Sequence, residues 1–419
     1  MKRLFIYPKV IQRMREGPIG AYIDSYVNYL IKYGFSKETS CRRVRLVADL
    51  SRWLERNAIS IHDIDEHIVD KYLRHRKLTS YINDYDNPTL RRLLRLLRDI
   101  KVIDKKPVPK TFRTQLSVIE KEFTTYLLQE RRLLYRTIAN YIPHIKKFIA
   151  ERFGKNPIQF NKLCSEDITG FVQRFVNDSN SLSYSERMTT ALRIFLRYLR
   201  YKDEITTNLA LCVPSVAKWK LASLPKFIRP DQVQIVLQSF DLQTSIGKRN
   251  CAIILLLSRL GLRAGEISAL KIEDIDWENG VITIFGKGGR KDRFPIPNDV
   301  GRAIAIYLKS GRPNCLSRCV FVRHKPPICG FKNYMAISTM VHRALERVGV
   351  GKDLPYIGAH LFRHTLATEM LQHGFTLGEV GEILRHQSLN TTAIYAKVDI
   401  KALKSLAKPW PGEVNNENP

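Results

Sequence analysis

The sequence has no long hydrophobic run. No stretch of about 18 apolar residues, the length that crosses a bilayer, occurs anywhere in the 419 residues. The apolar stretch 251–257, "CAIILLL", is followed at once by Ser258 and Arg259, so we expect it to lie in a buried helix. The N-terminal "MKRLFIYPKVIQRMREG" lacks the apolar segment of a secretory signal. These absences favour a cytoplasmic protein without a membrane span.

Cysteine is sparse, with seven residues scattered along the chain. An odd, dispersed set does not form a disulfide framework and fits a reducing compartment. Cys315, Cys319, His324 and Cys329 lie close together and are residue types that bind zinc. Their spacing matches no strong metal signature, so we interpret them as buried or incidental thiols. The sequence therefore predicts neither a metal site nor a cofactor.

Acidic residues are too few to balance the basic ones. There are 40 Asp and Glu against 69 Lys and Arg, which gives a net charge of +29. Such an excess is costly in self-repulsion unless a polyanion offsets it, and nucleic acid is the usual one. An anionic membrane surface is the second candidate. With 44% hydrophobic residues, the chain is long enough for two or three packed domains.

Two segments of the N-terminal half resemble each other. The segment 26–55 parallels 123–151, each then reaches an acidic residue followed by Ile (Asp63, Asp167), and each ends in a basic helix, 94–103 or 196–205. Apolar residues recur at helical spacing throughout. We predict two small helical domains of one design, 1–106 and 107–215, joined by the linker "DKKPVPK". The alternative is that any two amphipathic helical segments look alike.

The character of the chain changes after a second linker, 213–230. Pro230 opens a helix in its first turn, and a long apolar helix runs to Leu260. The stretches 281–285 and 292–296 predict two strands joined by a glycine-rich hairpin. Helices dominate again up to Leu406. We predict a mainly α fold with a small antiparallel β-sheet, a third domain over 226–408 and a mobile tail over 409–419.

The same region contains the groups needed to cut a DNA phosphodiester without a metal. A nucleophile must lose a proton, fixed cations must hold the non-bridging oxygens, and the leaving oxygen needs a proton. A free tyrosine has a pKa of about 10, so ionising it at pH 7 costs roughly 4 kcal/mol, and the site must supply a base or a positive field. Guanidinium groups match phosphate oxygens and stay charged. The candidate residues are Arg263, Lys287, His360, Arg363, His386 and Tyr395.

The order of these motifs resembles the tyrosine recombinase (phage integrase) family. The motifs are "GLRAGEI", a Gly-Lys-Gly hairpin, "HLFRHTLAT", "LRH" and a tyrosine nine residues further on, and the resemblance covers 227–406. The preceding helical repeat resembles the SAM-like core-binding domain of that family. The segment "YAKVDIKALKSLAKPWPG" looks like integrases carried by bacterial mobile elements. The resemblance implies a helical DNA-binding part followed by a catalytic domain.

The resemblance also implies a role for each candidate. Tyr395 would attack the scissile phosphate and form a 3′-phosphotyrosyl link, and Lys287 would protonate the leaving 5′ oxygen, with Lys291 as a rival. Arg263 and Arg363 would hold the non-bridging oxygens, and Glu266 would support the site structurally. His360 would be the base or proton carrier, and His386 would hydrogen-bond the phosphate. Because the covalent link preserves the bond energy, neither ATP nor a metal is required.

The sequence departs from the family pattern at two positions. Arg385 stands where the family usually has glycine, and Glu369 stands where many members have histidine. We interpret His364 as structural. A helix that starts near 390–392 would carry Tyr395 back toward His386.

Basic helices are candidates for contact with the DNA backbone, which supplies affinity rather than sequence readout. A solvated charged face is the alternative for each. The candidate side chains are Arg42, Arg43, Arg45, Arg91, Arg92, Arg95, Arg98, Arg193, Arg197 and Arg385.

The sequence thus predicts a site-specific recombinase that integrates, moves or resolves a mobile element. The family implies a homotetramer on double-stranded DNA, alone or with companion recombinases, and the segment "DIKALKSLA" is a candidate for packing on a neighbouring protomer. Two alternatives remain: a type IB topoisomerase, which relaxes DNA by the same chemistry, and a non-catalytic DNA-binding accessory protein.

Overall fold

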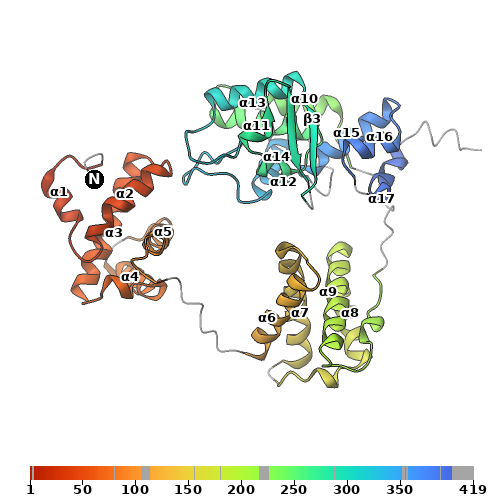
Figure 1. Cartoon of the computed structure of the whole chain (residues 1–419), viewed down its shortest axis with the longest axis horizontal. Coiled ribbons are helices and arrows are strands. Elements are labelled where there is room, and N and C mark those ends of the chain that lie inside the picture. The colour runs from red at the N-terminus through yellow and green to blue at the C-terminus, as the bar shows by residue number, and fades with distance from the viewer. Residues whose placement is uncertain are drawn as a thin grey trace, which may run out of the picture. The chain divides into compact units, whose positions relative to one another are not determined.

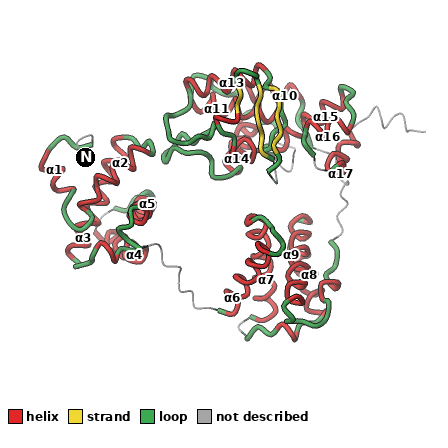
Figure 2. Tube along the Cα trace, viewed as in Figure 1, coloured by secondary structure: helices red, strands yellow, loops and turns green. Residues whose placement is uncertain are grey.

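The structure is a computed structural model that describes residues 1, 4–79, 81–104, 114–154, 156–179, 181–216, 226–286, 289–351, 354, 357–386 and 388–398. The chain divides into two compact units, one made of Met1–Lys105 with Ser223–Pro419 and the other of Lys106–Ala222. Figure 2 shows that helices predominate and that strands occur in one small sheet within the described part. The predicted fold class is confirmed.

The N-terminal segment is a helical bundle with a core of its own. Its helices are α1 (Pro8–Met14), α2 (Ile23–Lys32), α3 (Lys37–Arg56), α4 (Glu66–Thr79) and α5 (Asp86–Asp99), with 3₁₀ turns at Gly20–Tyr22 and Ile61–Asp63 (Figure 1). Ser36 caps α3 by accepting from the backbone N–H of Thr39. The core runs from Leu4 to Ile103 and includes the fully buried Tyr26 and Leu94. Apolar residues at helical spacing thus close a core within this segment.

The second unit repeats the order of these elements. It contains α6 (Gln115–Gln129), α7 (Tyr135–Phe153), a 3₁₀ turn (Phe160–Lys162), α8 (Ser165–Asp178), α9 (Leu182–Tyr201) and a 3₁₀ turn (Leu209–Cys212). Edge-to-face rings, such as Phe123 and Phe195 at 5.1 Å, fill its core. Helix pair, 3₁₀ turn and second helix pair occur in the order seen from α2 to α5, so the sequence similarity extends to the architecture.

The two acidic residues that precede Ile differ in position. Asp63 ends a 3₁₀ turn, whereas Asp167 lies in the first turn of α8. The helix α4 begins instead after Asp65, whose carboxylate accepts from the backbone N–H of Ile68 at 2.8 Å. A side-chain cap must reach a free N–H of the first turn, and only Asp65 is placed to do so here.

The third segment combines helices with the sheet. Its elements are α10 (Pro230–Gln238), α11 (Ser245–Arg259), α12 (Ala264–Ala269), a 3₁₀ turn (Ile272–Asp274), β1 (Ile275–Asp276), β2 (Val281–Phe285), β3 (Lys291–Pro295), α13 (Asn298–Ser310), α14 (Met335–Arg347) and α15 (His360–Gln372). The antiparallel sheet has the order β1-β2-β3, with Ile282 opposite both Ile275 and Phe294. The strand β2 matches its prediction, and β3 lies one residue earlier than predicted. One core joins α10–α14 and the sheet to the start of α15.

The C-terminal part that is described consists of α16 (Leu377–Ile383), α17 (Leu389–Thr392) and a 3₁₀ helix (Ala393–Val398). Together with α15 it encloses a second, small apolar cluster, and Tyr395 is one of its members. The predicted C-terminal helix 399–407 and the tail lie outside the described residues. The three-domain division stays a prediction, although each predicted domain has a separate core.

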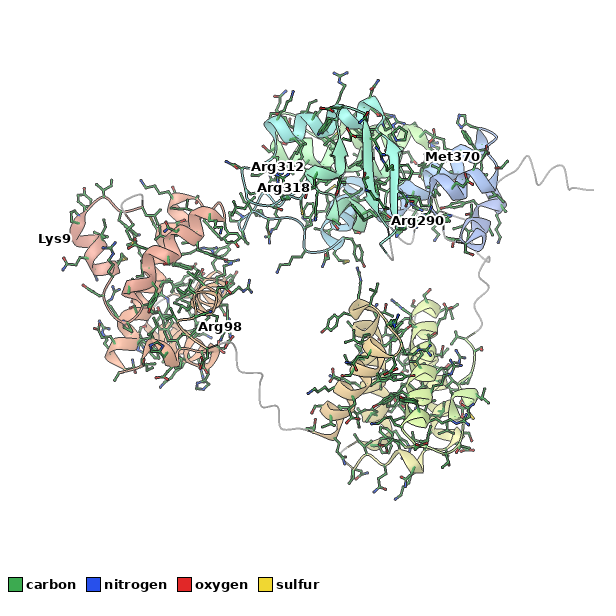
Figure 3. The ribbon with its side chains drawn as sticks, in the orientation of Figure 1. Lys9, Arg98, Arg290, Arg312, Arg318 and Met370 are labelled. Carbon is green, nitrogen blue, oxygen red and sulfur yellow. The ribbon has the colours of Figure 1, made fainter. Side chains whose placement is uncertain are left out.

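Two further features bear on the sequence expectations. Across the described ranges, no helix is long and apolar enough to cross a membrane. The loop after α13 is held by Arg312, which donates to the carbonyl oxygens of Ser317, Cys319 and Val320, whereas Arg318 of the same loop forms an exposed ion pair with Glu273 (Figure 3).

Candidate active site

Arg263 precedes α12 and is held by the carboxylate of Glu266. The backbone N–H of Arg263 donates to Oε2 of Glu266 at 2.8 Å, and Nη1 donates to Oε1 at 2.9 Å. Glu266 also caps the free end of α12, as an acidic residue at the third position often does. The side chain of Arg263 is 37% exposed and that of Glu266 is 6% exposed. The guanidinium is therefore oriented by a buried anion while part of it faces outward, as the expected supporting role of Glu266 requires.

Arg363, in the first turn of α15, joins two other segments. Its Nη1 donates to the carbonyl oxygen of Gly261 and its Nη2 to that of Leu384. These carbonyls lie two residues before Arg263 and two before His386, so one buried guanidinium links the segments that carry both. Burial, followed by the charge of Arg263, lowers the pKa of Arg363 to about 10, which leaves it charged at neutral pH.

Gly261 is required at this junction. Its φ is +55°, and a Cβ placed there would lie 2.7 Å from Cδ2 of Leu384. A side chain would be strained by this backbone conformation and would displace the end of the Leu384 side chain.

The two candidate histidines are neutral at physiological pH. His360 begins α15, and burial, aided by the charge of Arg363, lowers its pKa. Burial and then Arg363 also lower the pKa of His386 to about 4. Nδ1 of His386 hydrogen-bonds to the hydroxyl of Thr392 at 2.7 Å, which fixes the ring. A neutral imidazole can accept or donate one hydrogen bond at each nitrogen, as a proton carrier must.

Tyr395 lies close to the histidines but is buried. It is 1% exposed, and its ring stacks parallel to that of His386 with the centroids 6.4 Å apart. Its hydroxyl hydrogen-bonds to Nδ1 of His364 at 2.7 Å. Burial raises the pKa of Tyr395 to about 12 and lowers that of His364 to about 4. The sequence was right to expect Tyr395 near His386, and the structure shows its hydroxyl bonded to His364 inside the protein.

Two site residues were interpreted differently from sequence. His364 was expected to be structural, yet it is the hydrogen-bond partner of the tyrosine; its spacing of four from His360 was the available signal. For Arg385 the sequence predicts a contact with the DNA backbone, and the structure shows a side chain that is 5% exposed and paired with Glu266. A side chain that follows a helix end can fold inward, and the sequence does not reveal this.

Lys287 lies outside the described residues, so its position stays a prediction. Its rival Lys291 begins β3 and is exposed. Among the described residues, no group of three or more His, Cys, Asp or Glu side chains could hold a metal ion. All seven cysteines are free thiols.

The arginines proposed to bind the DNA backbone fall into two groups. Four of them are exposed: Arg42, Arg45, Arg95 and Arg197. Others contact the protein itself: Arg91 pairs with Asp70, Arg98 pairs with Glu66 through two hydrogen bonds, and Arg193 donates to the carbonyl oxygens of Val213 and Pro214. Arg43 is 9% exposed, and Arg43 and Arg92 both lie over the ring of Phe35. The exposed group is the better candidate for phosphate contact, and contact by the second group stays a prediction.

Comparison with known proteins places this site in a family. The phage integrase family matches residues 226–401. A putative integrase/recombinase of Sinorhizobium fredii is 41% identical over 403 residues, which cover 96% of this chain and 97% of that protein. Tyrosine recombinase XerD of Listeria monocytogenes is 27% identical over 69% of this chain and 97% of its own length. The crystal structure of XerH bound to palindromic difH substrate, a post-cleavage complex, shares the fold with a TM-score of 0.57, at 22% identity over 73% of this chain and 90% of that one.

The fold and the relatives define a tyrosine recombinase, an enzyme that cuts and rejoins DNA at specific sites. The chain belongs to the phage integrase family. The topoisomerase and accessory-protein alternatives are not favoured, because these relatives are integrases and recombinases.

Proposed function

We propose that this protein recombines DNA through covalent attachment of Tyr395 to the 3′ phosphate of a cut strand. The observation that carries the proposal is the position of Arg363, which holds the Arg263 and His386 segments together beside Tyr395. Arg263 and Arg363 supply cations for the non-bridging oxygens, and His386 supplies a neutral hydrogen-bonding ring. Stabilising the charge that develops on the phosphate is the largest contribution such a site can make.

The reaction requires no group from outside the chain. The oxygen of Tyr395 forms a bond to phosphorus, its proton passes to His360, and the bond from phosphorus to the 5′ oxygen breaks. Lys287 gives a proton to that oxygen. Because one phosphoester replaces another, the free 5′ hydroxyl of a second strand can reverse the step and rejoin the DNA without ATP or a metal.

The resting tyrosine must be activated before it can react. From a pKa of about 12, ionising Tyr395 at pH 7 costs about 7 kcal/mol. The hydroxyl must also leave His364. Bound phosphate, with the arginines around it, is the source of energy for both steps. Cleavage is thereby restricted to the DNA-bound enzyme.

The DNA is held, in this proposal, by exposed arginines of both helical segments, and the protein acts in the cytoplasm. Recombination joins two duplexes and therefore needs paired active sites, so we propose a homotetramer on DNA, with or without companion recombinases. Chemical cross-linking of the chain on its DNA tests this. A single protomer on a recombining substrate would contradict it.

The cleavage reaction is tested with nicked duplexes tiled across the DNA that flanks the gene. A nick lets the short strand diffuse away, so the covalent adduct accumulates. The wild type is expected to form an SDS-resistant adduct that maps to Tyr395, in the presence of EDTA, and Tyr395→Phe is expected to form none. Wild type that forms no adduct on any duplex contradicts the proposal. Relaxation of supercoiled plasmids without recombinant products would favour the topoisomerase alternative.

A further inference from the structure

Helix α16 ends in a backbone conformation that favours glycine. The N–H of Arg385 donates to the carbonyl oxygen of Glu382 at 2.9 Å, and that of His386 donates to Gly381 at 2.8 Å. These two bonds form a Schellman closure, which places the residue after the cap in the left-handed region. That residue is Arg385, with φ +55°. Its Cβ makes this conformation costly, since only glycine adopts it freely.

Among the described helices, three others end in the same closure with a residue other than glycine, so the backbone alone does not set Arg385 apart. Ala58, Lys101 and Asp203 follow α3, α5 and α9 with φ of +51°, +59° and +54°. The side chains of these three residues are exposed. Arg385 differs in that its side chain is buried. Arg385 thus places a buried guanidinium at a backbone position that glycine would occupy with less strain.

The guanidinium of Arg385 is only partly satisfied. Its Nη2 donates to Oε2 of Glu266 at 2.9 Å, and the group lies over the ring of Phe294 at 5.1 Å. Nε and Nη1 are buried and have no hydrogen-bond partner among the described residues. Unused N–H groups of a buried charge are costly, so a ligand that accepts hydrogen bonds from them would be bound favourably.

The surroundings indicate the charge of that ligand. Glu266 also binds Arg263, and Arg363 lies near enough for Arg263 and Arg385 to affect its ionisation. Two of these three guanidinium groups bind the one carboxylate and the third bonds to backbone carbonyl oxygens, which leaves an excess of positive charge. Arg385 and His386 line one cavity, together with Thr392 and the exposed Arg290 and Glu382, so its charged lining is two arginines against one carboxylate. An anion that enters this cavity would meet both Arg385 and the proposed phosphate-binding histidine.

We propose that Arg385 is a third arginine of the phosphate site. Its Nε and Nη1 donate to a phosphate oxygen of bound DNA, while Nη2 holds Glu266 and, through it, Arg263. This assignment rests on the proposed function, and it gives the predicted DNA-backbone contact of Arg385 a place in the active site. It also accounts for arginine at a position where the backbone favours glycine.

The test uses Arg385→Gly in the full-length chain, with Lys101→Gly as the matched control. Both changes replace a cation in the left-handed position of a Schellman closure by glycine, so both variants are expected to fold, which circular dichroism checks. Two quantities are measured on a nicked duplex that the wild type cleaves: the rate of covalent adduct formation at saturating DNA, and the salt dependence of binding by fluorescence anisotropy. Arg385→Lys, which keeps the positive charge but loses the planar guanidinium and its several N–H donors, is the third variant.

The proposal predicts that Arg385→Gly slows adduct formation at least ten-fold at saturating DNA. The slope of log K against log salt should fall by about one, the value for one lost phosphate contact. Lys101→Gly should keep the wild-type rate, and Arg385→Lys should regain the slope but only part of the rate. A wild-type rate in Arg385→Gly overturns the assignment, and so does a slower rate with an unchanged slope, which would indicate a purely structural role. If the wild type itself forms no adduct, the proposed function fails; the slope on a 30-base-pair random duplex then still tests Arg385.

Discussion

Replacing Glu266 by glutamine should destabilise the catalytic part of the chain more than any loss of a surface ion pair. The carboxylate accepts three hydrogen bonds, two from Arg263 and one from Arg385, at 2.8 to 2.9 Å. Glutamine retains one acceptor oxygen and presents an amide NH₂ to a donor at the other position. It also leaves Arg263 and Arg385 without the anion that they share.

The magnitude follows from the burial of the pair. The side chains of Glu266 and Arg385 are 6% and 3% exposed. Removing one partner of a buried ion pair costs about 3–5 kcal/mol, and one kcal/mol lowers the melting temperature of a domain of this size by about 2–4 °C. The expected decrease is therefore roughly 6–20 °C. Glu273→Gln is the control, because it breaks the exposed pair with Arg318, which is worth less than about 1 kcal/mol.

The assay is differential scanning calorimetry of both variants, with hydrogen exchange of peptides from 261–270 to assign the transition. Glu266→Gln should melt earlier and exchange faster in those peptides, whereas Glu273→Gln should match the wild type. If the two variants melt within about 2 °C of each other, the carboxylate does not organise the arginines, and the reasoning on Arg385 loses its basis as well.

Three further outcomes follow from the same structure. His364→Ala removes the hydrogen-bond partner of the Tyr395 hydroxyl, so tetranitromethane should nitrate Tyr395 faster, as peptide mapping can show. An unchanged nitration rate would contradict the idea that His364 holds Tyr395 in place. In the folded protein the pKa values of His364 and His386 are about 4, below the unfolded value of about 6.5. The stability that these histidines contribute is therefore complete above pH 6.5 and decreases as the pH falls toward 4. A melting temperature that is constant over this range would refute this pH dependence. Arg312→Ala loses charged hydrogen bonds to loop carbonyl oxygens and should lower the free energy of unfolding by about 3 kcal/mol, as measured by urea unfolding. Equal stability of Arg312→Ala and Arg318→Ala would argue against a role of Arg312 in holding the loop.

The sequence predicted the parts of the site whose positions depend on local periodicity. His360 and Arg363 are three residues apart, and α15 places both in its first turn as expected. Arg263 precedes a short helix because Glu266, three residues later, can close the capping interaction. Contacts between residues three or four positions apart in a helix can be predicted from sequence spacing alone.

Features that depend on tertiary contacts could not be predicted in this way. Arginines are usually exposed, and the sequence does not show that Arg385 is buried against a carboxylate 119 residues away. Arg43 is buried for a similar reason, since its guanidinium packs on the ring of Phe35. The sequence also does not show which of Asp63 and Asp65 caps α4, because only the backbone geometry decides which carboxylate reaches the N–H of Ile68.

Tyr395 is at once the proposed nucleophile and a core residue of the small cluster formed with Ala367, Met370, Leu371 and other apolar side chains. If its ring leaves this cluster to join DNA, a void remains in the C-terminal region for as long as the covalent link lasts. Returning a ring of that size to an apolar site is worth about 2–3 kcal/mol. The covalent intermediate would then be locally loosened and open to proteases, and the refilling of the void would favour resealing of the strand. The packing of the protein would thus help to limit the lifetime of its own DNA break.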